Sequence, residues 1–124
     1  MEPKRINLPE LGLPVGPYVH AVLHQSTLYT SGFTAYGTDA QSGSVSEQAR
    51  AIFTQLLTIA ESQNTSIEKL VKVTLFVTDL ERISELRDCL MDLYAGAVPA
   101  SSLVKVDQLF SPELLIEIEA IFAL

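Results

Sequence analysis

Two glutamates stand close together in an apolar segment near the end of the chain. Glu117 and Glu119 are two residues apart and alternate with isoleucines. In an extended strand this spacing places both carboxylates on the same face. Carboxylates are seldom buried without partners. The face is therefore either solvated or paired with Lys72 or Lys105, or it holds a general acid/base in a cleft.

One arginine interrupts the apolar face of a predicted helix. Between about Leu80 and Tyr94, apolar residues recur with helical spacing, and Arg87 falls among them rather than on the acidic side. A guanidinium keeps its charge and needs an anion, an aromatic face or water. Arg87 either reaches water at the helix edge, or pairs with an acid such as Glu117 or Glu119, or points into a cleft to bind a carboxylate.

Other residues offer little chemistry. His20 and His24 are four residues apart, but they fall on a strand and its turn, where that separation spans roughly 13 Å. We therefore expect no shared metal, only a strand-end histidine and an exposed turn histidine. The single cysteine, Cys89, cannot form an internal disulfide. The chain has no Gly-rich phosphate loop of standard spacing, no nucleophile elbow and no His-Glu-x-x-His motif.

Strands and helices must position these residues. The first 17 residues contain four prolines and predict an extended lead-in. Ser44 and Glu47 have the spacing of a capping box at the start of a helix. Asp79 is expected to cap a second helix, over about residues 80–94, which Gly96 ends. Alternating or apolar runs predict strands over residues 18–23, 27–31, 71–78, 101–106 and 114–124.

This order, β-β-α-β-α-β-β, predicts an α+β fold in which two helices cover one face of a mixed sheet. The other face must then meet solvent or another subunit. The chain has 124 residues and a net charge of −7, so we expect one domain spanning residues 1–124. No apolar run approaches the roughly 20 residues of a membrane helix. We expect a cytoplasmic protein with no membrane partner, and no nucleic-acid partner because Lys and Arg are not clustered.

Five short motifs give the chain a resemblance to the RidA/YjgF family, the reactive-intermediate deaminases. The motifs are Gly16-Pro17-Tyr18, Thr30-Ser31-Gly32, the segment 73–80, Pro99-Ala100 and the segment 116–121. The resemblance covers nearly the whole chain. It implies a chorismate-mutase-like fold and a homotrimer with a central barrel and clefts between subunits. It also implies hydrolysis of enamines and imines such as 2-aminoacrylate, with an arginine that grips the substrate carboxylate, a glutamate that aligns water, and no metal or organic cofactor.

The same resemblance supplies site residues by position. It implies catalytic roles for Glu119 and Tyr18. The expected ligand-binding residues are Arg87, Ser31, Gly32, Phe33, Ser101, Ser102 and Leu103, the last through its backbone. Three of these positions depart from the family pattern. Ser101 stands where the family has its carboxylate-binding arginine, Phe33 replaces a glutamine, and Arg87 replaces a helix asparagine associated with the cleft.

Two functions are compatible with these expectations. The first is an enamine or imine hydrolase acting on a small carboxylate or carbonyl metabolite, with Arg87 supplying the guanidinium that Ser101 lacks. The second is a binding module for a small metabolite or a protein, without turnover. Ribonuclease activity is also ascribed to the family, but a trimer would carry three times −7, or −21, which repels RNA.

Overall fold

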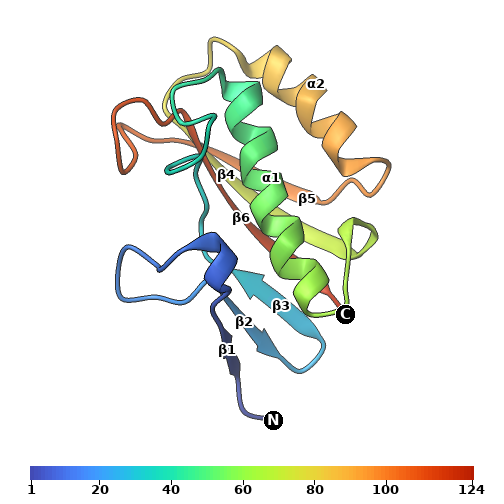
Figure 1. Ribbon diagram of the computed structural model, residues 1–124. Helices are drawn as coiled ribbons and strands as arrows, with labels where there is room; N and C mark the ends of the chain where they lie inside the picture. The colour runs from blue at the N-terminus through green and yellow to red at the C-terminus, as the bar shows by residue number, and fades with distance from the viewer.

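A computed structural model describes residues 1–124 and shows a six-stranded mixed sheet with two helices on one face (Figure 1). The elements are β1 (Lys4–Ile6), β2 (Ala21–His24), β3 (Thr27–Thr30), α1 (Val45–Ser62), β4 (Leu70–Val77), α2 (Ile83–Tyr94), β5 (Ala100–Lys105) and β6 (Ile116–Ala123). The strand order is β1-β2-β3-β6-β4-β5. Only β4 and β5 pair in parallel, because helix α2 carries the chain back across the sheet between them. The expected α+β class is confirmed.

Helix α1 begins where the sequence predicts. The Ser44 hydroxyl accepts a hydrogen bond from the Glu47 amide at 3.1 Å, and the Glu47 carboxylate accepts one from the Ser44 amide at 2.8 Å. This reciprocal pair satisfies two amides that the helix leaves without partners. The apolar stripe of α1 packs on the sheet, with Ile52, Phe53 and Leu56 almost fully buried. Neither helix has the length and apolar content needed to span a membrane.

Helix α2 begins three residues later than the sequence predicts. The Asp79 carboxylate accepts a hydrogen bond from the Glu81 amide at 3.0 Å, which closes a local turn instead of capping the helix. Leu80 therefore lies outside the helix and is exposed. At its other end, α2 is followed by Ala95 and Gly96, both with positive φ, the usual geometry for ending a helix.

The N-terminal segment forms a strand that the sequence pattern does not predict. Strand β1 pairs antiparallel with β2, with Ile6 opposite Ala21. Its three residues lie between Pro3 and Pro9, so the prolines flank the ladder rather than interrupt it. Three residues are too few to show an alternating pattern, so the sequence predicts only an extended lead-in here. The element order is thus β-β-β-α-β-α-β-β, counting β1.

The face of the sheet opposite the helices is uncovered. Along β6, Ile116, Ile118, Ala120 and Phe122 are buried toward the helices, whereas the intervening side chains point the other way. On that second face, which we call the open face, Tyr29 and Val104 are 44% and 41% exposed. Lys72 and the glutamates of β6 lie among such apolar side chains. The open face therefore combines charged groups with exposed apolar area.

Candidate functional site

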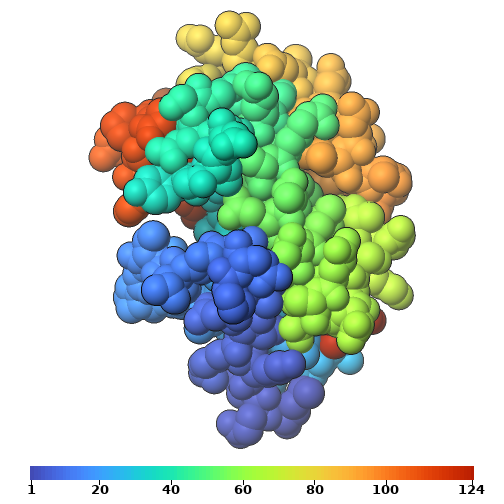
Figure 2. All heavy atoms as spheres, in the orientation of Figure 1, coloured from blue at the N-terminus to red at the C-terminus, as the bar shows by residue number.

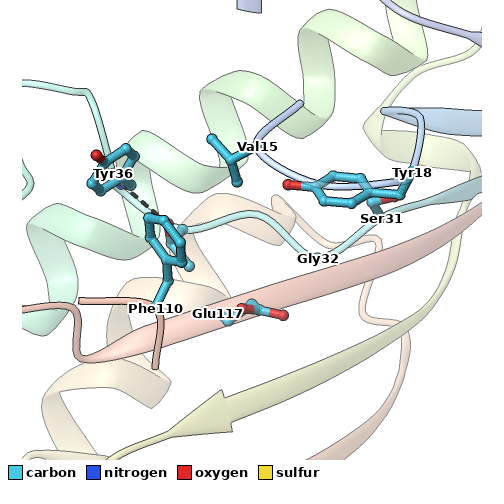
Figure 3. A pocket seen from close by; sticks show the side chains of 8 residues that line it. Val15, Tyr18, Ser31, Gly32, Tyr36, Phe110 and Glu117 are labelled. Atoms are coloured by element: carbon cyan, nitrogen blue, oxygen red, sulfur yellow. Dashed lines mark hydrogen bonds between the residues drawn. The ribbon is translucent and has the colours of Figure 1, made fainter. Parts of the chain in front are cut away.

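A pocket of about 460 Å³ opens where β3 ends, beside β6 (Figure 3). Three segments that are distant in the sequence form its walls. The lining residues are Val15, Tyr18, Ser31, Gly32, Thr34, Tyr36, Phe110 and Glu117. We call it the Glu117 pocket, because Glu117 is the only carboxylate among these residues.

The electrostatics of the pocket centre on Glu117. Its side chain is half-buried at the floor of the pocket. Burial raises the pKa of the Glu117 carboxyl above its ordinary value, and the charge of nearby Glu119 raises this pKa further. A carboxyl group with a raised pKa holds its proton to a higher pH than an ordinary glutamate does. Glu117 is thus suited to general acid/base chemistry.

The backbone beside β3 lies directly against the Glu117 side chain. The amide of Phe33 donates to the carbonyl of Ile118 at 2.9 Å, and the amide of Ile118 donates back at 3.0 Å. This pair brings Gly32 directly against the Glu117 side chain. A Cβ atom at position 32 would lie only 2.9 Å from Glu117 Cδ. Glycine here therefore permits the close approach of the Glu117 side chain, and its backbone angle is not unusual.

Ser31 and Tyr18 form the wall that faces this carboxyl group. The Ser31 hydroxyl donates to the Val19 carbonyl at 2.5 Å, and the Ser31 amide donates to the His20 carbonyl at 2.9 Å. Both bonds tie the end of β3 to the segment that enters β2. Tyr18 is 45% exposed, and its ring lies along one side of the pocket (Figure 3). Ser31, Gly32 and Tyr18, expected as site residues, thus lie together.

Glu119 does not line the Glu117 pocket. It lies farther along β6, opposite Thr74 of β4, in a hollow of about 250 Å³ on the open face that also includes Tyr29 and Lys72. The Lys72 ammonium group donates to the Ser102 hydroxyl at 3.3 Å. The structure therefore places Glu117, rather than Glu119, with Tyr18, and it places Ser102 near the Glu119 hollow.

Three further expected residues meet in a groove between α2 and β5. Arg87, Ser101 and Leu103 line this groove of about 360 Å³, whose other walls are mostly apolar. We call it the Arg87 groove. At its base, burial raises the pKa of Tyr94 to about 12. The side chains of Glu117 and Glu119 lie on the opposite face of the sheet from α2. The alternative in which Arg87 pairs with either glutamate of its own chain is therefore wrong.

Phe33 and the histidines lie outside the Glu117 pocket. The Phe33 ring faces the ring of His20, with centroids 5.7 Å apart. His20 is buried rather than simply placed at a strand end, and its Nδ1 accepts a hydrogen bond from the Leu8 amide at 3.0 Å. His24 instead contacts the Met1 carbonyl through Nε2. No group of three His, Cys, Asp or Glu side chains is close enough to bind a metal ion together.

Several lining residues were not anticipated from the sequence. Val15, Thr34, Tyr36 and Phe110 come from loops without any periodic pattern. The Tyr36 and Phe110 rings pack edge to face, with their centroids 4.9 Å apart, and together they close one side of the pocket. The one feature of the sequence that could have indicated these residues is an aromatic side chain in an otherwise polar loop. This feature does not reveal which loops come together in the fold.

Comparison with known families and proteins identifies relatives that match nearly the whole chain. The model of the endoribonuclease L-PSP family matches residues 10–124. A 2-iminobutanoate/2-iminopropanoate deaminase of Dermatophagoides farinae is 29% identical, over 98% of this chain and 97% of that protein. A RutC family protein of Aquifex aeolicus is 32% identical, over 95% of this chain and 98% of that protein.

Solved structures agree with these sequence matches. A conserved Rid family protein from Yersinia pestis, of unknown function, superposes with a TM-score of 0.88 at 27% identity. The match covers 99% of this chain and all of that one. A member of the YjgF/YER057c/UK114 family from Mycobacterium tuberculosis has a TM-score of 0.82 at 24% identity, over 99% of this chain and 100% of that one. The second match supports the fold alone.

Proposed function

Because the chain belongs to the RidA/YjgF family, whose family model is named endoribonuclease L-PSP, we propose that it hydrolyses small imines or enamines in clefts between the subunits of a homotrimer. Glu117 carries the proposal, as a half-buried carboxyl with a raised pKa in a pocket with Tyr18, Ser31 and Gly32. The deaminase of Dermatophagoides farinae supports imines as the substrate class. In this proposal Glu117, rather than Glu119, is the catalytic glutamate that the family resemblance implied.

The proposed reaction adds water across a carbon–nitrogen double bond. The Glu117 carboxylate accepts a proton from water while the water oxygen bonds to the imine carbon. The resulting carboxyl group donates that proton to the nitrogen, which gives a carbinolamine. The regenerated Glu117 carboxylate then accepts the proton of the carbinolamine hydroxyl group and passes it to the nitrogen as the carbon–nitrogen bond breaks, so that ammonia leaves a carbonyl product. A single group serves as base and then as acid, which works best when its pKa is close to the working pH. An enamine enters the same route after protonation at carbon.

Assembly into a trimer would complete this site. The Glu117 pocket and the Arg87 groove share no lining residue within one chain. In the proposed trimer, the groove of one subunit faces the pocket of the next. Arg87 then binds the substrate carboxylate, with Ser101 and the Leu103 backbone beside it. The uncovered open face and the exposed edge strand β5 support such an assembly, because closed cyclic symmetry buries both without leaving free edges.

Light scattering in dilute buffer is expected to give three times the subunit mass of 13.6 kDa. The physical reason is the apolar area on the open face, which one subunit cannot cover with its own two helices. A clean monomer would contradict the composite site, because the Glu117 pocket and the Arg87 groove would then remain separate.

Turnover of freshly generated 2-aminoacrylate tests the proposed function directly. We expect hydrolysis that is measurable but slower than in relatives with an arginine at the position of Ser101. A hydroxyl lacks the charge that opposes a carboxylate, and a charge-assisted hydrogen bond contributes about 1.5–3 kcal/mol. Ser101→Arg is expected to raise kcat/KM. Full activity in the unmodified protein together with no effect of Ser101→Arg would contradict this account of the groove.

The second candidate is a trimeric binding module without turnover. The observation that favours it is the neutral Ser101 in the Arg87 groove. Ammonia release decides between the two functions. If small carboxylates bind and imines yield no ammonia above the uncatalysed rate, the protein is a binding module.

A further inference from the structure

Two aromatic rings from different loops form one side of the Glu117 pocket, which we call the aromatic wall. Tyr36 belongs to the loop between β3 and α1, and Phe110 belongs to the loop between β5 and β6. The two loops lie side by side on the surface, teal and red-orange in Figure 2. The rings of Tyr36 and Phe110 are 46% and 63% exposed. Burial in the core therefore does not fix the aromatic wall, and other contacts must set its position.

A chain of polar side chains joins the two loops beside these rings. The side-chain amide of Gln41 donates to Glu113 Oε1 at 2.5 Å, and Gln41 Oε1 accepts from the Gly37 amide at 2.7 Å. The second carboxylate oxygen of Glu113, Oε2, accepts from the Ser111 hydroxyl at 2.7 Å. We call these three hydrogen bonds the Gln41–Glu113 bridge. Its two ends, at Gly37 and Ser111, each follow directly after one of the two aromatic residues in the sequence.

Glu113 is the central member of the bridge. The hydroxyl of Ser111 and the amide of Gln41 hold the pKa of the Glu113 carboxyl below its ordinary value. Glu113 is therefore a carboxylate at neutral pH, and hydrogen bonds to an ionised acceptor are stronger than those between neutral groups. Removal of this one side chain breaks two of the three bonds and disconnects the two loops at the level of the rings.

The buried Gln48 anchors the bases of the same two loops independently of the bridge. Its side-chain amide donates to the carbonyls of Gly43 and Glu113 at 3.1 and 3.0 Å, and its Oε1 accepts from the Leu115 amide at 2.8 Å. These bonds do not involve the Glu113 carboxylate. The loop bases therefore stay in place when the bridge is broken, and the change is confined to the segments that carry the rings.

We infer that Gln41 and Glu113 are positioning residues: their bridge holds the aromatic wall at the Glu117 pocket and does not itself contact the substrate. Neither residue lines the pocket. The effect on turnover rests on the proposed function, whereas the effect on the position of the rings does not. With the bridge broken, the rings separate, and the substrate loses an aromatic contact and binds more weakly. Glu117 lies on β6, outside the two loops, so the chemical step itself is preserved.

A fluorophore in the aromatic wall tests the bridge without requiring turnover. The chain contains no tryptophan, so Tyr36→Trp introduces a single indole beside Phe110. In this background, Glu113→Ala is expected to raise the acrylamide quenching constant roughly 2-fold, because a ring that is 46% exposed loses the cover of its partner.

Two matched variants make the quenching result specific. Glu113→Gln retains an oxygen for the Gln41 amide and an amide group for the Ser111 hydroxyl, so quenching is expected to stay at its original level. Glu61→Ala removes the same charge from an exposed site on α1 that lines no pocket, and it is also expected to leave quenching unchanged. Unchanged quenching in Glu113→Ala, or an equal rise in Glu113→Gln or Glu61→Ala, would overturn the inference.

Steady-state kinetics test whether the bridge acts through the aromatic wall. Glu113→Ala is expected to raise KM for an imine roughly 2- to 10-fold, the range that one aromatic contact contributes, and to leave kcat unchanged. In a Phe110→Ala background the wall is already lost, so adding Glu113→Ala is expected to change KM no further. An equal rise in KM in both backgrounds, or a fall in kcat with KM unchanged, would overturn the inference. If no imine releases ammonia, the proposed function fails, and the quenching experiment still decides whether the bridge positions the rings.

Discussion

Glu117→Gln is expected to lower kcat/KM for imine hydrolysis by roughly 10²–10⁴-fold, the usual contribution of a positioned general acid/base. Glutamine keeps the shape of the side chain but cannot accept a proton from water. The measurement is ammonia release from an imine generated in the assay. Activity that survives in Glu117→Gln would remove Glu117 from the mechanism.

The stability of Glu117→Gln should not fall. Because the pKa of Glu117 in the folded protein is raised above its unfolded value, folding favours the protonated carboxyl group. The carboxylate therefore weakens stability as the pH rises from the unfolded pKa through the raised folded pKa. Near neutral pH, the uncharged glutamine is expected to give an equal or higher melting temperature. Lost activity with preserved stability separates a catalytic role from a structural one.

Glu119→Gln is the matched control on the same strand. It removes a like charge near Glu117, so the pKa of Glu117 falls toward its ordinary value. The limb of the pH–rate profile that reports Glu117 should move to lower pH while turnover persists. If Glu119→Gln abolishes turnover and Glu117→Gln does not, the catalytic carboxylate is Glu119, as the family resemblance implied.

Gly32→Ala is a companion variant that keeps the carboxyl group but displaces it. The added methyl group would collide with the end of the Glu117 side chain. That end is flexible and can turn aside, so the expected effect is a loss of turnover larger than any change in melting temperature.

Arg87→Ala is expected to weaken binding of small carboxylates, measured with pyruvate, at least 10-fold. Loss of a charge-assisted hydrogen bond is worth about 1.5–3 kcal/mol, or about 10- to 150-fold. The melting temperature should change little, because Arg87 is exposed and does not pair with Glu117 or Glu119 of its own chain. Its place beside Ser101 in an otherwise apolar groove motivates the prediction.

Two further variants make the Arg87 result specific. Arg50→Ala removes the same charge from an exposed site on α1 that lines no pocket, so it corrects for the change in net charge. Arg87→Lys keeps the charge but loses the two-pronged geometry of the guanidinium, so an intermediate affinity is expected. If pyruvate binding survives in Arg87→Ala while the protein melts several degrees lower, Arg87 is structural and the role as an anion anchor should be abandoned.

Features with a short range along the chain could be predicted from the sequence. The capping box of Ser44 and Glu47, the apolar stripe of α1 and the alternation along β6 follow from hydrogen bonds and side-chain periods that span a few residues. The predicted elements differ from the structure where the sequence pattern was too short or allowed two local structures. Strand β1 has only three residues. The Asp79 carboxylate accepts a hydrogen bond from the Glu81 amide in a local turn, instead of capping α2.

The sequence by itself determined that Glu117 and Glu119 share one face of a strand and that Arg87 lies on the apolar side of a helix. Which carboxylate joins Tyr18, and what surrounds Arg87, was decided only by the tertiary structure. Two residues along a strand displace a side chain by roughly 6.6 Å, enough to move it from one pocket to the next. The Glu117 pocket depends on the pairing of Phe33 with Ile118, 85 residues apart in the sequence. No local pattern encodes that register, because backbone pairing between distant segments is selected by the packing of the whole sheet.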